Sequence, residues 1–142
     1  MEKLKLFVRK MITVTPIQKR FADIDMLGHV NNVNQQHYFD LGKSDYFMQV
    51  INGPTAWNKQ GLIAVATNTN YMAQIRYQEP IEVRTRLEKI GNKSLTLFQQ
   101  IVNTQTEEIK SESRSVLVAF DFVAQLSIPI PPDWRAKFEA QL

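Results

Sequence analysis

Apolar and polar residues alternate along much of the chain, and the alternation is cleanest between residues 81 and 88. Ile81, Val83, Thr85 and Leu87 occupy every second position there, and charged residues occupy the positions between them. A period of two places one set of side chains on each face of a β-strand. Stretches rich in Val, Ile, Thr and Phe predict further strands over 6–17, 63–75, 95–102 and 111–122.

The segment from Val33 to Ile51 differs because it lacks proline and spaces its apolar residues as in a helix. Asn31 or Asn32 is suited to cap this helix, since its side chain accepts a hydrogen bond from an unpaired backbone N–H group. The helix is expected to end at Asn52-Gly53-Pro54. A second, short helix is expected after the proline-rich stretch 128–132 near the C-terminus.

The predicted order is one strand, one long helix and then four strands joined by short connections. Short connections require antiparallel pairing, because a parallel crossover needs a dozen residues or more. Such a sheet buries its apolar face most efficiently by curling around the helix. We therefore expect an α+β fold, with a five-stranded antiparallel sheet wrapped around one long central helix, in a single domain over residues 1–142.

Composition excludes several classes of function. The 142 residues include no cysteine, which excludes disulfides, thiolate metal sites and a cysteine nucleophile. The net charge is +3, but the basic residues are scattered, so we expect no nucleic-acid partner. No apolar run approaches the roughly 20 residues needed to span a bilayer, so we expect no membrane partner. The charged N-terminal ten residues lack the apolar core of a signal peptide, and a cytoplasmic location is expected.

Polar residues suited to catalysis are concentrated just before the long helix. Asp23, Asp25, Gly28 and His29 precede the two asparagines that begin it. A helix N-terminus offers unpaired N–H groups that can polarise a carbonyl, and an ionised aspartate beside it can activate water or attack directly. Capping and turn formation explain the same residues without any chemistry. The two histidines lack an evident third ligand, so no metal site is expected.

A resemblance favours catalysis over capping alone. The segment Asp23-Ile-Asp-Met-Leu-Gly-His-Val-Asn-Asn32, followed by Tyr38, resembles the signature of the 4-hydroxybenzoyl-CoA thioesterase-like (YbgC/FadM-type) branch of the hotdog-fold superfamily. The resemblance extends over almost the whole chain, including the turn at 90–95 and the tail at 128–134. It implies the hotdog fold, hydrolysis of an acyl-CoA thioester, no cofactor, and assembly into homodimers that can pair into homotetramers.

The resemblance also implies roles for individual residues. The catalytic aspartate falls on Asp25, acting as general base or as nucleophile, while Asp23 matches a less constant, structural position. Backbone amides near 32–34 would polarise the thioester carbonyl. The implied substrate-binding residues are His29, Val30, Asn31, Asn32, Tyr38, Tyr71, Lys93 and Ser94. Of these, Lys93 and Ser94 would meet the coenzyme A phosphates, with Arg84 or Arg86 as further candidates.

Several alternatives stay open. The stretch Val33-Asn-Gln-Gln-His37 is bulkier and more polar than the family pattern, which would alter the acyl pocket. Hydrolysis of thioesters on acyl carrier protein, or acyl-CoA binding without hydrolysis, would use the same fold. The identity of the acyl group does not follow from the sequence.

Overall fold

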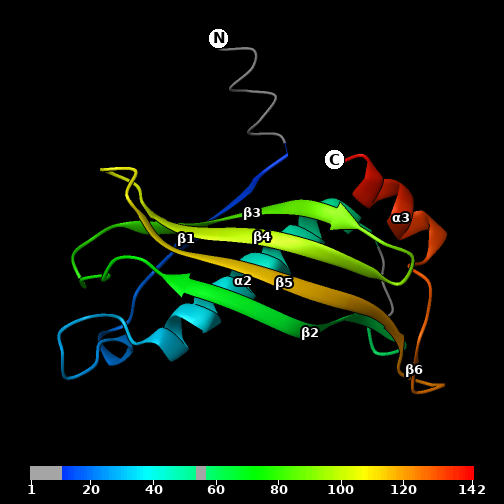
Figure 1. The fold of residues 1–142 in the computed structure, drawn as a ribbon, viewed down its shortest axis with the longest axis horizontal. Coiled ribbons are helices and arrows are strands. Elements are labelled where there is room, and N and C mark those ends of the chain that lie inside the picture. The colour runs from blue at the N-terminus through cyan, green and yellow to red at the C-terminus, as the bar shows by residue number, and fades with distance from the viewer. Residues whose placement is uncertain (1–10, 54–56) are drawn as a thin grey trace, which may run out of the picture.

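The structure, a computed structural model, describes residues 11–53 and 57–142 (Figure 1). Its elements are β1 (Thr13–Ile17), the 3₁₀ helix η1 (Phe21–Asp23), α2 (Asn32–Ile51), β2 (Gln60–Tyr71), β3 (Ile81–Ile90), β4 (Ser94–Asn103), β5 (Ile109–Asp121), β6 (Leu126–Ser127) and α3 (Pro132–Glu139). No helix among the described residues is both long and apolar enough to span a membrane.

The strands form one antiparallel sheet in the order β1-β3-β4-β5-β2, and the two-residue β6 pairs with β5. The helix α2 lies across one face of this sheet, and α3 covers one end of it (Figure 1). The predicted α+β architecture is therefore confirmed, with β6 as a small addition. Strands β1 and β2 are the two edges of the main sheet. Pro16 has no backbone N–H group, and at an edge strand this removes no hydrogen bond between central strands.

The central helix begins where the sequence predicts. Asn31 is the N-cap, and its side chain accepts a 2.8 Å hydrogen bond from the backbone N–H of Val33. The helix ends at Asn52, which adopts the left-handed conformation with φ of 40°. Both ends are thus closed by asparagine, which tolerates these conformations better than most residues do.

At Gly42, α2 lies close against side chains of β3 and β4. A Cβ atom at this position would lie 2.7 Å from Cγ1 of Val83 and 2.9 Å from Nε2 of Gln99. Any larger residue would have to displace these side chains of β3 and β4. Gln99 is fully buried here and donates hydrogen bonds to the Phe39 carbonyl and the Thr85 hydroxyl.

The core consists of two clusters on the helix side of the sheet. One packs α3 residues such as Trp134 and Phe138 against the C-terminal half of α2. The other surrounds the start of α2 and contains Val30, Tyr38, Phe39, Ile75, Ile81, Val83 and Ile101. The second cluster supports the loop that precedes the helix.

Predicted and observed boundaries differ most at the start of the first strand and at the end of the second. The first strand was expected over 6–17, but β1 begins at Thr13, and residues 6–10 lie outside the described part of the chain. The strand expected to reach Ile75 ends at Tyr71. The backbone N–H groups of Met72 and Ala73 both donate to the carbonyl of Lys110, which turns the chain out of the ladder. Ile75 is nevertheless fully buried, in the core rather than in a strand.

Candidate active site

The loop between β1 and α2 is anchored by Asp23. Its carboxylate is almost fully buried and accepts a 2.6 Å hydrogen bond from the Tyr38 hydroxyl. Arg20 adds three further hydrogen bonds, two from its guanidinium and one from its backbone N–H. The Asp23 carbonyl accepts from the backbone of Asn31 and the side chain of Asn34. Asp23 therefore joins the loop to the first turns of α2.

These bonds fix the charge of Asp23. Burial acts to raise the pKa of this carboxyl, but the hydrogen bonds from Tyr38 and Arg20 outweigh it and hold the pKa below its ordinary value. Burial and the neighbouring carboxylate together raise the pKa of Tyr38. Asp23 is thus ionised, and its carboxylate oxygens are occupied by the hydrogen bonds from Tyr38 and Arg20. This arrangement supports a structural role for Asp23.

Asp25 is held differently, in a tight turn that leaves its carboxylate partly exposed. The Gly28 N–H donates to the Asp25 carbonyl, and the Asp25 N–H donates to the His29 carbonyl. Gly28 has a φ of 81°, which favours glycine and allows the turn to close. One carboxylate oxygen accepts a 2.9 Å hydrogen bond from the Leu27 N–H. The other oxygen accepts no hydrogen bond from a described residue and is available to a ligand.

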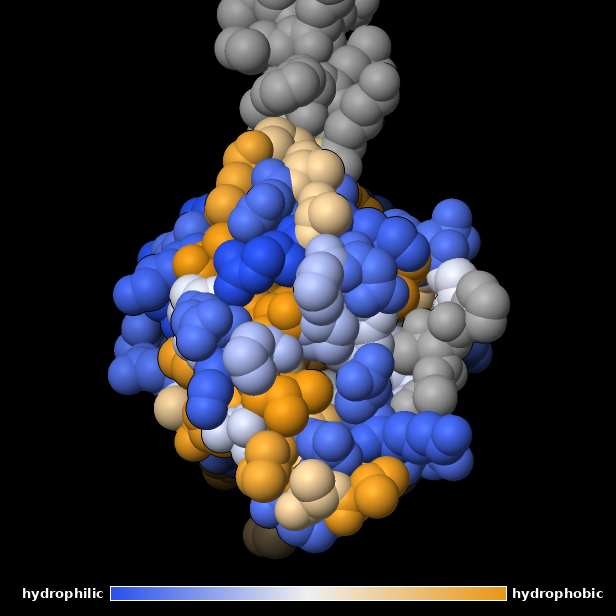
Figure 2. Space-filling model, turned by 90° about the vertical axis from the view of Figure 1, so that its right-hand side faces the viewer, coloured by the Kyte–Doolittle hydropathy of each residue, from blue (hydrophilic) through white to orange (hydrophobic). Residues whose placement is uncertain are grey.

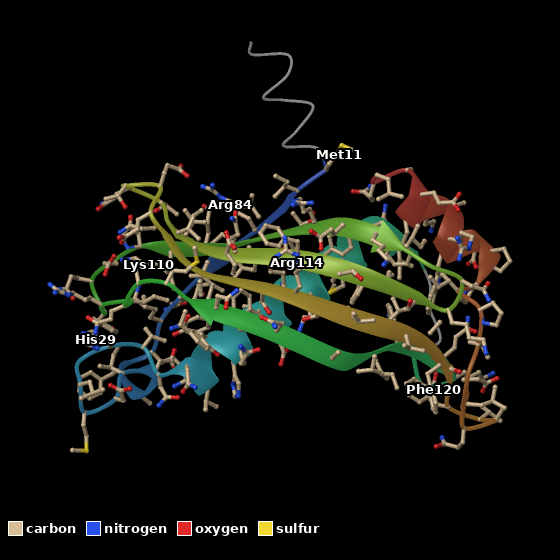
Figure 3. All side chains as sticks on the ribbon, in the orientation of Figure 1. Met11, His29, Arg84, Lys110, Arg114 and Phe120 are labelled. Atoms are coloured by element: carbon tan, nitrogen blue, oxygen red, sulfur yellow. The ribbon has the colours of Figure 1, made fainter. Side chains whose placement is uncertain are left out.

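Asp25 borders a cleft of about 290 Å³ between this loop, the start of α2 and the segment after β2. His29 marks this end of the molecule in Figure 3. The residues that line the cleft are Asp25, Leu27, His29, Val30, Asn32, Gln35, Tyr71, Met72, Ala73 and Gln74. Most are apolar or uncharged, and Asp25 is the one carboxylate among them. The cleft can therefore take an apolar group beside an ionisable carboxylate.

The N-terminus of α2 opens on the same cleft. The Val33 N–H is used by the Asn31 cap, whereas the N–H groups of Asn32 and Asn34 have no acceptor among the described residues. Asn32 also lines the cleft. Free N–H groups and the partial positive charge of a helix N-terminus stabilise negative charge that develops nearby.

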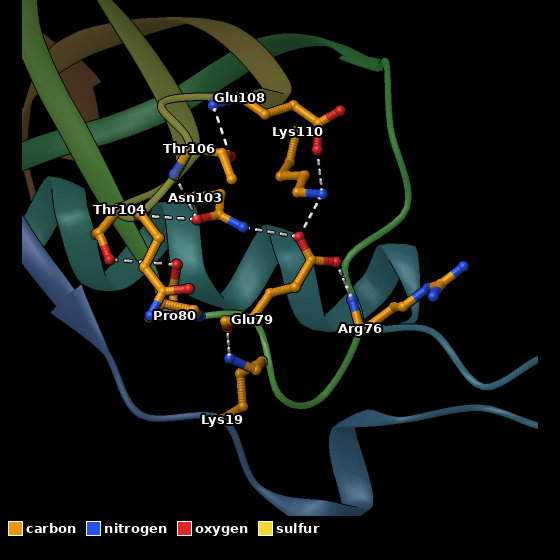
Figure 4. A network of polar contacts seen from close by, with 10 residues as sticks. Lys19, Arg76, Glu79, Pro80, Asn103, Thr104, Thr106, Glu108 and Lys110 are labelled. Atoms are coloured by element: carbon orange, nitrogen blue, oxygen red, sulfur yellow. Dashed lines mark hydrogen bonds and ion pairs between the residues drawn. The ribbon is translucent and has the colours of Figure 1, made fainter.

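The far wall of the cleft is held by a charged network around Glu79 (Figure 4). Glu79 accepts hydrogen bonds from the Arg76 N–H and the Asn103 side chain and pairs with Lys110 at 2.5 Å. Burial alone would raise the pKa of Glu79, but these contacts lower it to about 2. Because the Lys110 carbonyl accepts from Met72 and Ala73, the network positions two residues that line the cleft.

Five of the eight predicted binding residues lie in or beside this cleft. His29, Val30, Asn32 and Tyr71 line it, and Asn31 caps the helix at its edge. Tyr38 does not line it, because its ring is buried and its hydroxyl binds Asp23.

Lys93 and Ser94 lie at the opposite end of the sheet, where β3 turns into β4 (Figure 1). The ten-residue β3 separates the two ends by about 30 Å. Figure 2 looks onto that far end and shows apolar side chains scattered among polar ones. Within one chain, these residues therefore lie far from the carboxylate of Asp25.

The two further arginine candidates have other contacts on the sheet. Arg84 pairs with Glu82 and Glu107 at 2.8 Å each. The guanidinium of Arg86 stacks over the ring of Phe98, 4.6 Å from its centre.

Gln35 and the segment 72–74 belong to the cleft but were not predicted. A glutamine within a helix is typical of a solvated surface, and the segment 72–74 was expected to continue a strand. The polar stretch that departs from the family pattern was the one signal that pointed to Gln35.

Comparisons with known proteins agree with this description. A family model described as "Thioesterase-like superfamily" matches residues 20–138. The uncharacterized protein YsmA of Bacillus subtilis (strain 168) is 32% identical over 92 residues. That match covers 64% of this chain and 61% of the relative, which is less than two thirds of its length.

Solved structures share the fold over nearly the whole chain. A "predicted thioesterase" from Bacillus stearothermophilus is 27% identical with a TM-score of 0.82, covering 92% of this chain and 96% of that one. A thioesterase from Thermus thermophilus, complexed with coenzyme A and zinc, is 22% identical with a TM-score of 0.79 and covers 92% and 93%. The predicted hotdog fold is therefore confirmed.

Proposed function

The chain belongs to the thioesterase-like superfamily, and we propose that it hydrolyses acyl-CoA thioesters to free coenzyme A and a carboxylic acid. We place it, within this proposal, in the 4-hydroxybenzoyl-CoA thioesterase-like (YbgC/FadM-type) branch, on the motif from Asp23 to Asn32. The cytoplasmic location inferred from the sequence belongs to the same proposal.

One observation carries the proposal: a carboxylate with an available oxygen and a helix N-terminus border the same cleft. Asp25 supplies the carboxylate, and Asn32 belongs to the first turn of α2. Thioester hydrolysis needs a group that activates the nucleophile and donors that stabilise the oxyanion formed on the carbonyl. The cleft offers both on adjoining walls.

In the first form of the mechanism, Asp25 acts as a general base. It takes a proton from water, and the resulting hydroxide attacks the thioester carbonyl carbon. The carbonyl oxygen becomes an oxyanion, which the N–H groups of Asn32 and Asn34 stabilise. The oxyanion then collapses, the C–S bond breaks, and the thiolate of coenzyme A takes up the proton that Asp25 removed from water, which restores the carboxylate as the acid is released.

In the second form, the Asp25 carboxylate itself attacks the carbonyl and expels the thiolate, which leaves an acyl-aspartyl anhydride that water then cleaves. Single-turnover hydrolysis in ¹⁸O-labelled water bears on the choice. Label found in Asp25 requires the anhydride, because a general base never exchanges its carboxylate oxygens with solvent through the reaction.

The experiment that tests the function is a thiol-release assay on the purified protein. It uses short, long and aromatic acyl-CoAs, together with the same acyl groups on acyl carrier protein at equal concentration. We expect thiol release from one or more acyl-CoAs, and slower release from the carrier-protein thioesters. Release from carrier-protein thioesters alone would reassign the substrate. Tight acyl-CoA binding without any release would identify a binding module instead.

We further propose a homodimer formed through the free edge of β2. This strand pairs with β5 alone among the described strands, and its residues Ala64 to Asn68 are exposed. An unpaired sheet edge is a ready template for pairing with another chain. Two-fold pairing of β2 with its copy would be antiparallel, so the β3–β4 turn of the partner would lie at the same end as Asp25.

This arrangement accounts for Lys93 and Ser94, which are too far from Asp25 in their own chain. In the dimer they would approach the coenzyme A phosphates bound to the other subunit. Size-exclusion chromatography with light scattering tests the assembly. We expect a mass twice the 16.4 kDa of one chain, or four times if dimers pair, whereas a mass of 16.4 kDa would refute it.

A further inference from the structure

The turn that joins β3 to β4 runs from Gly91 to Ser94, and all four of its backbone carbonyls accept hydrogen bonds. Two of them accept from one nitrogen of the Arg135 guanidinium, which reaches the turn from α3 (Figure 1). The carbonyls and their donors are Gly91 with Arg135, Asn92 with Arg135 at 3.1 Å and with Ile130, Lys93 with Ala119, and Ser94 with Gly91.

Most of the polar hydrogens of the same turn have no such partners. The backbone N–H groups of Asn92 and Lys93 and the hydroxyl of Ser94 donate to no described residue. The Lys93 ammonium forms no ion pair with a described residue either, and Asn92 and Lys93 are both exposed. Because its carbonyls are occupied, the backbone of the turn presents only donors to a ligand, and successive free N–H groups beside an ammonium suit a phosphate.

Arg135 is well placed to hold this arrangement. Its neighbours in α3, Trp134 and Phe138, are buried in the core, so the helix that carries the guanidinium is fixed. A charged donor forms stronger hydrogen bonds to carbonyls than a neutral one does. The Gly91 carbonyl has no other donor among the described residues, whereas that of Asn92 also accepts from the backbone of Ile130. Without the guanidinium, the turn is therefore free to rotate at Gly91.

We propose that Arg135 is a positioning residue for coenzyme A. It occupies two carbonyls of the β3–β4 turn and so keeps the N–H groups, the Ser94 hydroxyl and the Lys93 ammonium directed at the phosphates. This inference rests on the proposed function in one respect, namely that a coenzyme A derivative binds at this turn. Because the turn and Asp25 lie at opposite ends of the sheet, Arg135 acts on binding, through KM, and leaves kcat unchanged.

The test compares Arg135→Met, which removes the guanidinium and keeps an unbranched side chain, with the wild type. Glu139→Gln is the matched control, because it removes the exposed ion-pair partner of Arg135, 3.3 Å away, and leaves the bonds to the turn intact. Calorimetry measures binding of S-butyl-CoA, a thioether that is not hydrolysed. Steady-state kinetics use one acyl group on coenzyme A and on N-acetylcysteamine, which lacks the phosphates.

We expect Arg135→Met to weaken S-butyl-CoA binding and to raise KM for the acyl-CoA, each by about three- to tenfold. Its kcat, and its kcat/KM for the N-acetylcysteamine thioester, should stay within about twofold of the wild type, as should every value for Glu139→Gln. A merely structural role would instead lower kcat/KM for both thioesters alike, and that result overturns the inference. Unchanged S-butyl-CoA binding, or none to the wild type, overturns it as well.

A second variant separates positioning from direct contact. Lys93→Ala should weaken S-butyl-CoA binding in the wild type but much less in the Arg135→Met background, because the turn is already displaced there. If the two losses multiply instead, Arg135 does not act through the turn, and the inference is wrong.

These outcomes also separate the inference from the proposed function. Weaker thioether binding by Arg135→Met, coupled to Lys93, in a protein that releases no thiol from any acyl-CoA supports the inference and refutes hydrolysis. Thiol release with wild-type kinetics in Arg135→Met does the reverse.

Discussion

The hydroxyl of Tyr38 donates a 2.6 Å hydrogen bond to the buried carboxylate of Asp23. This bond joins the second turn of α2 to the loop that carries Asp25, across 15 positions of sequence. Tyr38 belongs to the core cluster around Val30 and Ile75, and Asp23 is buried beside its hydroxyl. The position of Asp25 relative to the helix N-terminus therefore depends on a pair that does not itself line the cleft.

Tyr38→Phe is expected to lower the free energy of unfolding by about 1–3 kcal/mol, because the buried Asp23 carboxylate loses its shortest hydrogen bond. Catalysis should fall through kcat more than through KM, since the loop loses its position while the cleft lining is unchanged. Urea unfolding and steady-state kinetics measure the two effects. Tyr77→Phe is the control, because Tyr77 is half exposed. Equal stability of Tyr38→Phe and the wild type would contradict this account.

Glu79→Gln tests the network behind the far wall of the cleft. The pKa of Glu79 is lowered to about 2, so its contribution to stability is present in full above its ordinary pKa and is lost as pH falls from about 5 toward 2. At pH 7 the variant should lose about 1–3 kcal/mol, because Lys110 loses one of its two carboxylate partners.

The difference between Glu79→Gln and the wild type should shrink as the pH is lowered through that window. Urea midpoints at pH 7, 5, 4 and 3 measure it. Glu139→Gln, which changes an exposed partner of Arg135, should leave both the stability and its pH dependence unaltered. A constant difference between Glu79→Gln and the wild type at every pH would argue against the assignment.

Gly42→Ala tests the contact between α2 and the sheet. Alanine is the better helix former by about 1 kcal/mol, so a purely local effect would stabilise the protein. The added Cβ would instead meet Val83 and Gln99 at less than 3.0 Å, and we expect a net loss of about 1–3 kcal/mol. Thermal unfolding of Gly42→Ala and of the exposed-site control Ser44→Ala gives the comparison. A rise in melting temperature for Gly42→Ala would refute the close approach.

Mixing two impaired variants tests whether Lys93 serves the partner's site. Asp25→Asn lacks the carboxylate, and Lys93→Glu repels the phosphates at low substrate concentration. Subunits exchanged at random should recover about a quarter of the wild-type rate, since half of the dimers are mixed and each has one intact site. No recovery above the average of the two separate variants would mean that Lys93 does not act across the interface.

The sequence predicted the strands and the helix because their apolar periods are set locally. It placed the end of β2 wrongly for a physical reason. The ladder has a bulge between Ala64 and Ala66, and the alternation continues to Ile75 although the backbone of Met72 already donates to Lys110. A residue can thus continue the apolar–polar alternation of a strand although it lies beyond the end of that strand and is buried in the core.

The site was predictable in part. Asp23 and Asp25 are alike in sequence, and only the family motif separated them, whereas in the structure Tyr38 and Arg20 occupy the carboxylate of Asp23. Gln35 could not be recognised as buried, because the segment that closes the cleft above it comes from residues 72–74, far along the chain. The distance of Lys93 from Asp25 depends on how strand directions place the turns, which residue types do not reveal.

The central claim is that the carboxylate of Asp25 performs the chemistry, and Asp25→Asn tests it most directly. The substitution keeps the shape of the side chain and removes the base or nucleophile. We predict that kcat/KM for the best acyl-CoA falls by about 10²- to 10⁴-fold, while thioether binding and the melting temperature stay near the wild-type values. Asp133→Asn, at an exposed position in α3, should keep full activity. Turnover by Asp25→Asn within a few-fold of the wild type on every good substrate would contradict the claim.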